Sequence, residues 1–485
     1  MRAASNLPWA LCLSLAACAP QPRPDAVAVA EPDATPTAAP TPAAATTLLR
    51  DVRVLTMTAG DREAHDGWSV LVRGGVIVEV GAAIAAPPGA AVIDGGGRTL
   101  MPGLIDMHVH VWDETELLAY LAHGVTTVRN MSGMPLHLDL AARIDAGALE
   151  GPRLITTGPI LNSPGPNEQI NHQLVADAAA ARAAVRTQHA QGYRHLKVYS
   201  NLTRAPYEAI VAEAEALGMT LTGHSPEGAR AEGVPFARPF DIRFEEVLGD
   251  GFVTLEHMET IVWHALADDL DEAKVRALAR SIAAAGVTVD PTLLAHHALV
   301  RMSETRGAWA QRPESGLLNP VLVAFEAEQY AAWAARDPEL RRAHDAFFAR
   351  AAAIFHEEGV TMVAGTDAGI FTNIPGSAMT RELELLVAAG IPAIDALAMA
   401  TTRGAAALGL GDTIGQIAPG FRAELILVDG DPLADIAVVE HPVGLLRGDA
   451  WRDAAALARL HDAASRHDPA RTQANFEAGL AAQRL

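Results

Sequence analysis

Six residues that can bind or bridge metal ions stand at the ends of apolar segments spread along the chain. His108-Val109-His110 closes the first such segment. Alternation along a strand would place both imidazoles on one face, about 6.5–7 Å apart at Cα, which suits two ligands of one cation. Later segments end at or near the other four members of the set, which are Lys197, His224, His257 and Asp367. Because imidazole and carboxylate groups are zinc ligands, the pattern predicts one shared metal centre.

Other polar residues near these segment ends are candidates for contact with a substrate. Tyr199 lies two residues after Lys197, on the same strand face, where it would either donate to a developing oxyanion or simply pack. Arg129 and Asn130 end the second segment, and a structural salt bridge is the alternative for Arg129. Two candidates follow the seventh segment, with an exposed or supporting position as their alternative; they are His296 and His297.

The segments that carry these residues predict an α/β fold. Apolar runs without polar alternation, separated by helical stretches, are typical of buried parallel strands. Eight such units within residues 101–410 predict a (β/α)8 TIM barrel, whose active site lies at the carboxyl ends of its strands. The expected strands are 103–110, 125–131, 153–157, 195–199, 219–224, 253–257, 287–291 and 361–367. The clearest expected helices are 206–217, 271–285 and 381–389, and residues 300–357 are expected to be helical and to form a lid.

Strand-like segments flank the barrel on both sides. Residues 47–100 contain short β-patterned runs with a hairpin turn at 73–75, and residues 411–450 return to the same pattern. These two segments are expected to pair into one small, β-sandwich-like domain. Residues 451–485 are expected to form a C-terminal helical segment.

The first 46 residues predict export and anchoring. Residues 1–18 read as a signal peptide, and Leu15-Ala16-Ala17-Cys18 resembles a bacterial lipobox, which makes Cys18 the expected lipidation site; an ordinary signal peptide is the alternative. Residues 19–46 are rich in Ala, Pro and Thr and are expected to be an extended tether. Ala19 after the cysteine suggests, by resemblance to known sorting rules, that the periplasmic protein is retained at the outer membrane of a Gram-negative bacterium.

Composition excludes several classes of function. The 485-residue chain has 37 Lys+Arg against 58 Asp+Glu and a formal net charge of −21, which argues against a nucleic-acid partner. After the leader, no apolar run approaches the ~20 residues of a spanning helix, so a lipid at Cys18 is the expected membrane attachment. Cys12 and Cys18 are the only cysteines, and both lie in the leader. The fold is therefore expected to contain no disulfide.

Over roughly residues 48–450 the sequence resembles the amidohydrolase superfamily. The motifs that carry the resemblance are Pro102-Gly103-Leu104-Ile105-Asp106-Met107-His108-Val109-His110, Leu196-Lys197-Val198-Tyr199-Ser200, Gly365-Thr366-Asp367-Ala368-Gly369 and Ile417-Ala418-Pro419-Gly420. The resemblance implies that His108, His110 and Asp367 bind one metal. It implies that His224 and His257 bind a second metal, and that a carboxylated Lys197 bridges the two. Two positions depart from the family pattern, because Glu424 replaces the more usual Asp and Thr380 replaces a frequent His.

The resemblance extends to the prolidase-like and N-acyl amino acid hydrolase branch. It implies a binuclear zinc hydrolase that cleaves the C–N amide bond of a small molecule, either a dipeptide or an N-acyl or aryl-acyl amino acid. A hydroxide bridging two Zn²⁺ ions would attack the carbonyl, Asp367 would act as general acid and base, and Tyr199 is the second catalytic candidate. The sequence leaves the substrate, the metal used in the cell and any homo-oligomer open.

Three alternatives remain at this point. His224-Ser225-Pro226-Glu227 fits the HxxE pattern of deaminases of the same superfamily, with Glu227 as the proton donor. Lys197 argues against this alternative, because those deaminases usually hold one metal and lack the lysine. A lactonase or esterase would use the same attack on an ester. A non-catalytic binding lipoprotein is least favoured, because all six ligand positions are filled.

Overall fold

The structure is a computed structural model that describes residues 45–228 and 240–483. The predicted signal peptide with Cys18, and the tether up to residue 44, lie outside the described residues. Within the described ranges, no helix combines the length and apolar character needed to cross a membrane.

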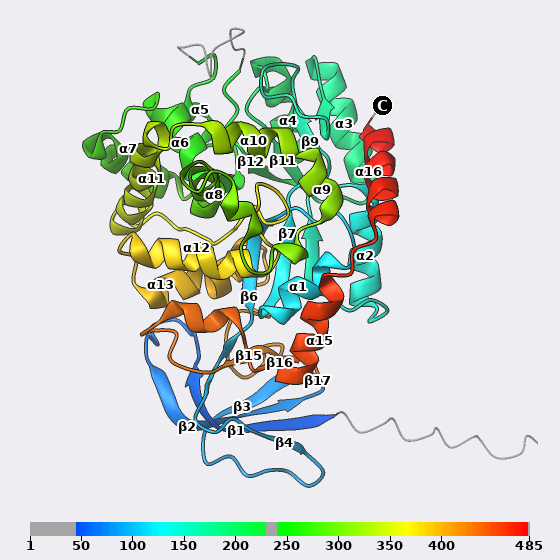
Figure 1. Ribbon diagram of the computed structural model, residues 1–485, viewed down its shortest axis with the longest axis vertical. Helices are drawn as coiled ribbons and strands as arrows, with labels where there is room; N and C mark the ends of the chain where they lie inside the picture. Colours follow the sequence, from blue (N-terminus) through cyan, green and yellow to red (C-terminus); the bar gives the residue numbers. More distant parts are fainter. Residues whose placement is uncertain (1–44, 229–239, 484–485) are drawn as a thin grey trace, which may run out of the picture. The chain divides into compact units, whose positions relative to one another are not determined.

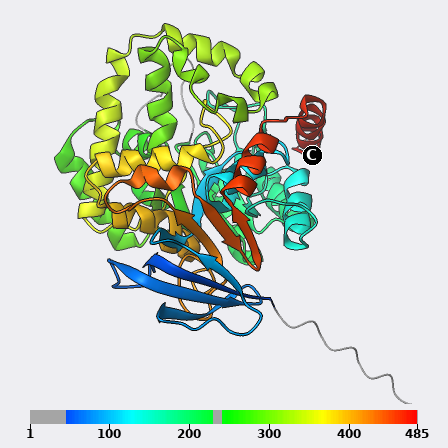
Figure 2. The same ribbon diagram turned by 60° about the horizontal axis from the view of Figure 1, so that its bottom comes forward.

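Strands from both ends of the chain form one mixed eight-stranded sheet, in the order β17-β16-β15-β5-β1-β2-β3, with β4 paired to β1 (Figures 1 and 2). The antiparallel pairing of β5 with β15, which sets Met101 opposite Ile426, joins the two halves. Leu49, Val72 and Leu446 belong to the apolar core of this sheet. Its strands are β1 (Thr46–Leu55), β2 (Ala64–Arg73), β3 (Val76–Ala82), β4 (Ala91–Asp94), β5 (Thr99–Pro102), β15 (Glu424–Val428), β16 (Gly444–Arg447) and β17 (Ala450–Asp453).

Parallel strands form the barrel in two runs, β6-β7-β8 and β10-β9-β11-β12-β13-β14. After β8, the amide of Thr157 donates to Asn130 of β7 and the amide of Gly158 donates to His195 of β11, which joins the two runs. The barrel strands are β6 (Leu104–Val109), β7 (Val125–Asn130), β8 (Arg153–Thr156), β9 (Ile160–Asn162), β10 (His172–Leu174), β11 (His195–Val198), β12 (Thr220–Gly223), β13 (Phe252–Glu256) and β14 (Thr288–Asp290).

The eighth expected strand, 361–367, is not a regular strand. Its backbone nevertheless lies between β6 and β14, because the amide of Val289 in β14 donates to Thr361 (2.9 Å) and the amide of Met107 in β6 donates to Ala364 (2.9 Å). Gly365 explains the close approach, since a Cβ there would lie 2.2 Å from Asp290 Oδ2. The α/β barrel predicted from the sequence is therefore confirmed, with an irregular last strand.

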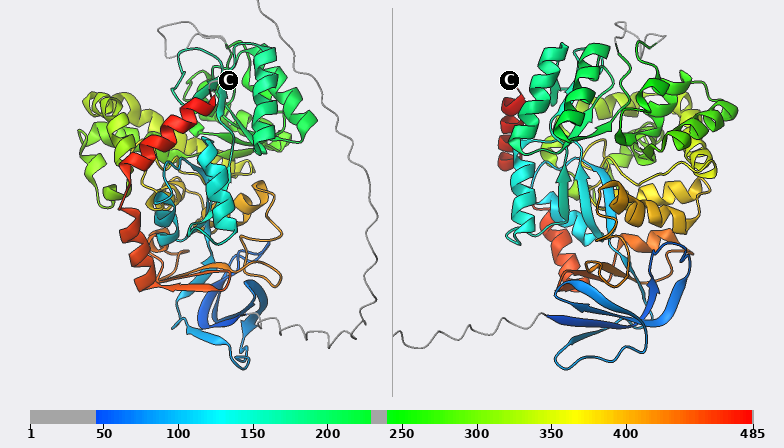
Figure 3. Two further views of the ribbon diagram at one scale, coloured as in Figure 1. Left: turned by 90° about the vertical axis from the view of Figure 1, so that its right-hand side faces the viewer. Right: turned by 180° about the vertical axis from the view of Figure 1, so that it is seen from behind.

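Helices cover the outside of the barrel, and α3 packs beside α4 (Figure 3). Asp177 and Asp271 cap α3 and α7 through their side chains, and Gly192 and Gly286 end these helices in the left-handed conformation. The helices outside residues 300–357 are α1 (Glu116–Ala122), α2 (Pro135–Asp145), α3 (Ala178–Gln191), α4 (Arg204–Leu217), α5 (Phe244–Val247), α6 (Met258–Leu266), α7 (Glu272–Ala285), α12 (Ser377–Ala388), α13 (Ala393–Ala398), α14 (Gly404–Ala407), α15 (Ala454–Ala464) and α16 (Pro469–Gln483).

Residues 300–357 are largely helical, as expected, with α10 packed against α8 and α11 packed against α7 (Figure 1). The helices of this region are α8 (Leu293–Glu304), α9 (Pro320–Phe325), α10 (Ala327–Ala335) and α11 (Glu339–Glu357). Short 3-10 segments are η1 (Ala308–Gln311), η2 (Ser315–Leu317) and η4 (Ile436–Glu440), and η3 (Met399–Arg403) is a π-helical turn. A lid function for this region stays a prediction.

Candidate metal centre

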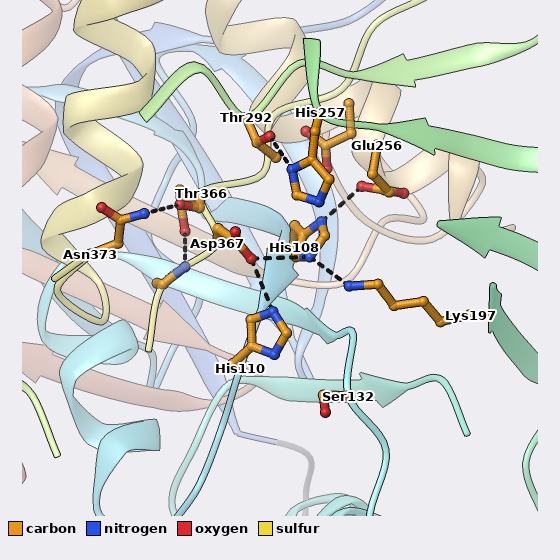
Figure 4. Close-up of polar contacts among 12 residues, drawn as sticks. His108, His110, Ser132, Lys197, Glu256, His257, Thr292, Thr366, Asp367 and Asn373 are labelled. Carbon is orange, nitrogen blue, oxygen red and sulfur yellow. Dashed lines mark hydrogen bonds and ion pairs between the residues drawn. The ribbon is translucent and has the colours of Figure 1, made fainter. Parts of the chain in front are cut away.

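His108, His110 and Asp367 meet where the first and last barrel segments lie side by side (Figure 4). His110 Nε2 lies 2.9 Å from Asp367 Oδ1, and His108 Nε2 lies 3.2 Å from the same oxygen. One ligand atom from each residue lies within 4.8 Å of the others. Asp367 has φ +57°, a conformation that is uncommon outside glycine and that turns its carboxylate toward the two imidazoles.

Lys197, on β11, is buried beside His108. Its Nζ donates to His108 Nε2 (3.1 Å), and only 2% of the residue is exposed. Burial lowers the pKa of Lys197 to about 8, so a substantial fraction of the amine is neutral near physiological pH. A neutral, desolvated amine is the form that reacts with carbon dioxide.

His224 and His257 complete the ring of histidines. The ring centroid of His257 lies 4.7 Å from that of His108 and 4.5 Å from that of His224. His257 Nδ1 bonds Thr292 Oγ1 (2.7 Å), and the backbone of His257 has φ +69°. A hydrogen bond on Nδ1 fixes the ring and leaves Nε2 for a cation. The structure thus brings all six sequence-predicted ligand positions together.

Burial sets the charge states of these ligands. It lowers the pKa of His108 well below its ordinary value and the pKa of His257 to about 4, so both rings are neutral, the form that binds metals. Burial alone would raise the pKa of Asp367, but the hydrogen bond with His110 opposes burial, and the pKa lies well below its usual range. Asp367 is therefore ionised.

Glu256, on β13, orients His108 and was not singled out by sequence analysis. His108 Nδ1 donates to Glu256 Oε2 (2.9 Å), while Glu256 Oε1 accepts from Arg129 Nη2 (2.9 Å) and Thr222 Oγ1 (2.8 Å). Arg129 holds the pKa of Glu256 below its ordinary value against the opposing effect of burial. An acid at the end of a mostly apolar strand, one residue before His257, was the signal available in the sequence.

The contacts of His108 and His110 show whether the ligand atoms of this cluster are arranged to bind a cation. Because His108 Nδ1 donates to Glu256 and Nε2 accepts from Lys197, Nε2 presents a lone pair to Asp367 Oδ1 at 3.2 Å. A lone pair facing a carboxylate is repulsive unless a positive charge lies between them. His110 Nδ1 has no hydrogen-bond partner among the described residues. The arrangement fits metal binding.

A cavity of about 570 Å³ opens beside this cluster. Lys197, His257 and Asp367 form part of its wall, and Tyr199 lies beside them, with its ring centroid 3.9 Å from that of His224. Glu227, the proton donor of the deaminase alternative, also lines the cavity and is 1% exposed. His296 lines the cavity as well, with Nδ1 3.1 Å from Asp345 Oδ1.

Three other sequence candidates do not line the cavity. Arg129 is buried and bonded to Glu256, and it also donates to the carbonyl of Met107 (2.6 Å). Asn130 Oδ1 accepts from the amide of Val111 (3.0 Å). His297 turns its Nδ1 to Asp345 (2.8 Å). These contacts favour supporting roles over direct contact with a substrate.

The two positions that depart from the family pattern also lie outside the cavity wall. Thr380, on α12, is 1% exposed, and Glu424, on β15, lies 3.5 Å from Arg153 in the composite sheet. Among the described residues of the wall, the one cation besides Lys197 is Arg341 of α11, and no sequence motif marks it. Among the described residues, the Arg341 guanidinium has no ion-pair partner.

Comparison with known proteins decides the family. The model of the amidohydrolase family matches residues 99–448. The chain belongs to the amidohydrolase family. Members of this family are metal-dependent hydrolases, which agrees with the buried ligand cluster and confirms the resemblance seen in the sequence.

Relatives within the amidohydrolase family match in two ways. Among curated proteins, a dihydroorotase of Geobacter sulfurreducens is 46% identical over 66 residues, and a 5-methylthioadenosine/S-adenosylhomocysteine deaminase of Teredinibacter turnerae is 36% identical over 97 residues. These matches cover 14% and 19% of this chain and only 15% and 22% of those proteins. They therefore assign no activity to the whole chain.

Solved structures match over nearly their full length. Bottromycin amidohydrolase matches with a TM-score of 0.66 and 24% identity, covering 88% of this chain and 92% of that one. A Xaa-Pro dipeptidase with bound methionine matches with a TM-score of 0.64 and 20% identity, covering 84% and 100%. A prolidase complexed with N-methylphosphonate-L-proline matches with a TM-score of 0.61 and 23% identity, covering 84% and 99%. At this identity the likeness concerns the fold.

Proposed function

We propose that this amidohydrolase is a binuclear metal enzyme that cleaves the C–N amide bond of a small substrate carrying a free carboxylate, either a dipeptide or an N-acyl amino acid. The observation that carries the proposal is the buried convergence of three histidines, Asp367 and a lysine of lowered pKa at the wall of one cavity. The solved structures of a dipeptidase and a prolidase with the same fold support the choice of an amide substrate.

The ligands divide into two sets. His108, His110 and Asp367 would hold one cation, and His224 and His257 the other. Lys197 would react with carbon dioxide through its neutral amine, forming an N–C bond and releasing one proton, and the resulting carbamate would bridge the two cations. When bound, divalent cations such as Zn²⁺ would lower the pKa of water and polarise the carbonyl oxygen of the amide.

Residues of the chain supply the proton transfers and the orientation. Asp367 is ionised, so its carboxylate is ready to accept a proton from the attacking water and pass it to the leaving amine. Tyr199, at the cavity wall beside His224, would donate its hydroxyl proton in a hydrogen bond to the carbonyl oxygen as negative charge develops there. Glu256 keeps the His108 ring in place.

Arg341 and His296 support a substrate with a carboxylate. Both line the cavity, and His296 Nε2 is buried with no hydrogen-bond partner in the described part of the chain. The contact of His296 Nδ1 with Asp345 directs the opposite ring edge to the cavity. A guanidinium without an acidic partner beside an open imidazole nitrogen matches the geometry and charge of a carboxylate.

The test is a screen of dipeptides, N-acyl amino acids, lactones and esters, repeated with Arg341→Met. The substitution should raise KM for a carboxylate substrate at least about tenfold and leave its carboxamide analogue unaffected. Arg342→Met is the matched control, because Arg342 lies on the same helix and is paired with Glu304 and Glu339. Hydrolysis of lactones alone, or equal KM values for Arg341→Met and wild type, would contradict the proposed substrate class.

The deaminase alternative keeps two supporting observations. Glu227 is buried at the cavity wall, and a curated relative over a short stretch is a deaminase. Lys197 at the centre of the ligand cluster favours the two-metal hydrolase over this alternative.

A further inference from the structure

Two histidines and a glutamate cluster outside the cavity, where α1, α15 and the segment before η2 meet (Figure 1). His123 directly follows α1, His461 belongs to α15, and Glu314 directly precedes η2. None of these three described residues lines the cavity. One ligand atom of each lies within 4.8 Å of the others.

The protonation of His123 can be assigned from its contacts. The residue is 1% exposed, and its Nδ1 lies 2.8 Å from the carbonyl oxygen of Ala119. Because a carbonyl only accepts, Nδ1 carries the proton. In the neutral ring, Nε2 then presents a lone pair to both carboxylate oxygens of Glu314, each at 3.3 Å. That contact needs a positive charge, which is either a second proton on the ring or a shared cation.

The distances favour the shared cation. A charge-assisted N–H···O hydrogen bond is typically about 2.7–2.9 Å long. Two ligands of a tetrahedral Zn²⁺ with bonds of about 2.0–2.1 Å lie about 3.3–3.4 Å apart. In the cluster, His123 Nε2 lies 3.3 Å from Glu314, and His461 Nε2 lies 3.4 Å from Glu314 Oε1. Donation of Nδ1 to a backbone carbonyl is also the usual arrangement of a metal-binding histidine.

Packing holds the cluster in place. Ala119 of α1, Leu317 and Leu318 at η2, and Ala464 of α15 belong to one buried apolar cluster, so the backbones that carry the three ligands are fixed against one another. The ring centroid of His441 lies 5.8 Å from that of His123, at the edge of the cluster.

We propose that His123, Glu314 and His461 form a structural site for a divalent transition metal, with Zn²⁺ as the best-matched ion. The site joins α1 and α15 to the segment that leads into α9 and α10. Arg312, two residues before Glu314, donates to the carbonyl of Thr372 (2.6 Å), in the loop that follows Asp367. The metal would therefore stabilise α9, α10 and the loop that follows Asp367, all of which contribute to the cavity wall, and would take no part in the chemistry.

The test counts zinc in the full chain after equilibrium dialysis against buffered zinc. His461→Gln and Glu314→Gln should each bind one zinc fewer per chain than wild type. Their zinc-dependent increase in Tm should be smaller by at least about 2 °C. His189→Gln, on α3, is the matched control and should retain the wild-type zinc content. Hydrolysis by His461→Gln should stay within about twofold of wild type at saturating zinc.

A double variant separates this site from the catalytic one. The double variant His110→Asn with Asp367→Asn lacks two catalytic ligands, and it should still bind zinc at the His123, Glu314 and His461 site. Adding His461→Gln to the double variant should remove that bound zinc. The His461 side chain is 36% exposed, so its replacement is compatible with folding even if Glu314→Gln is not. Equal zinc content and equal Tm responses for wild type and His461→Gln would overturn the proposal and leave an imidazolium–carboxylate pair as the explanation of the cluster.

Discussion

Replacing Glu256 by glutamine should weaken metal binding and lower the stability of the barrel at the same time. The two oxygens of Glu256 accept from opposite sides, Oε2 from His108 and Oε1 from Arg129. A glutamine offers only one oxygen. Whichever way its amide is turned, the NH₂ group meets either the His108 ring N–H or the Arg129 guanidinium, both of which are donors.

The expected losses of stability and zinc affinity in Glu256→Gln follow from the burial of the ion pair between Glu256 and Arg129. Arg129 is 3% exposed, and burial together with the charge of Glu256 raises the pKa of nearby Asp290 far above its ordinary value, so Asp290 stays neutral. Glu256 is thus the ionised partner of Arg129. Removing one member of a buried ion pair costs about 3–5 kcal/mol. Loss of the group that orients a metal-binding histidine typically costs about 10- to 100-fold in metal affinity.

Two measurements check this expectation. Guanidinium unfolding of the metal-free protein gives the change in stability, and competition with a chromophoric chelator gives the zinc Kd. Glu424→Gln is the control, because Glu424 is also buried beside an arginine but lies in the composite sheet. It should lower stability and leave the zinc Kd unchanged. An unaltered zinc Kd and unfolding midpoint for Glu256→Gln would refute the assignment of Glu256 as the support of His108.

Four further expectations concern single residues. Asp367→Asn should keep the fold and lower kcat at least about 100-fold, measured with metal-replete enzyme, and near-normal turnover would remove Asp367 from the mechanism. Glu227→Gln should keep kcat/KM for an amide within about tenfold, whereas a thousandfold loss with metals intact would favour the deaminase mechanism. Burial raises the pKa of Glu116 to about 8 from an ordinary value of 4.5, so the folded chain retains a proton that the unfolded chain releases, and stability should fall as pH rises from about 5 to 8. Glu116→Gln should flatten that slope in unfolding midpoints taken across the pH range, and an unchanged slope would contradict the burial argument. Cys18→Ser should abolish incorporation of labelled fatty acid, and equal labelling of wild type and variant would exclude lipidation at Cys18.

The sequence predicts most of the fold because burial leaves a clear pattern. The segments that become β6, β7 and β11 to β14 are buried at nearly every position, because both faces of each strand are covered, and their apolar residues mark them in the sequence. The eighth strand is the exception. Its apolar run predicts a regular strand, but Gly365 and the left-handed backbone at Asp367 break the pairing. That break is visible only once the neighbouring strands are in place.

The metal-ligand positions can be predicted from the sequence. The residues that orient the ligands or contact a substrate are harder to predict. His108, Lys197 and Asp367 stand out because they interrupt apolar segments at strand ends. Glu256 needed the structure, because its role depends on Arg129 from another strand, far away in the sequence. Arg341 is harder still, since an arginine on an amphipathic helix resembles any solvated charge until the helix is placed over the cavity.

The composite sheet has a consequence for biosynthesis. The strands β1 to β5 are translated first, but β5 finds its partner β15 only about three hundred residues later. Until then, the edge of β5 displays unpaired backbone donors and acceptors, which are a template for pairing with other chains. Closing so long a loop is also slow. The nascent chain should therefore depend on chaperone protection until its last strands emerge, and truncation before β15 should yield an aggregating fragment instead of a smaller enzyme.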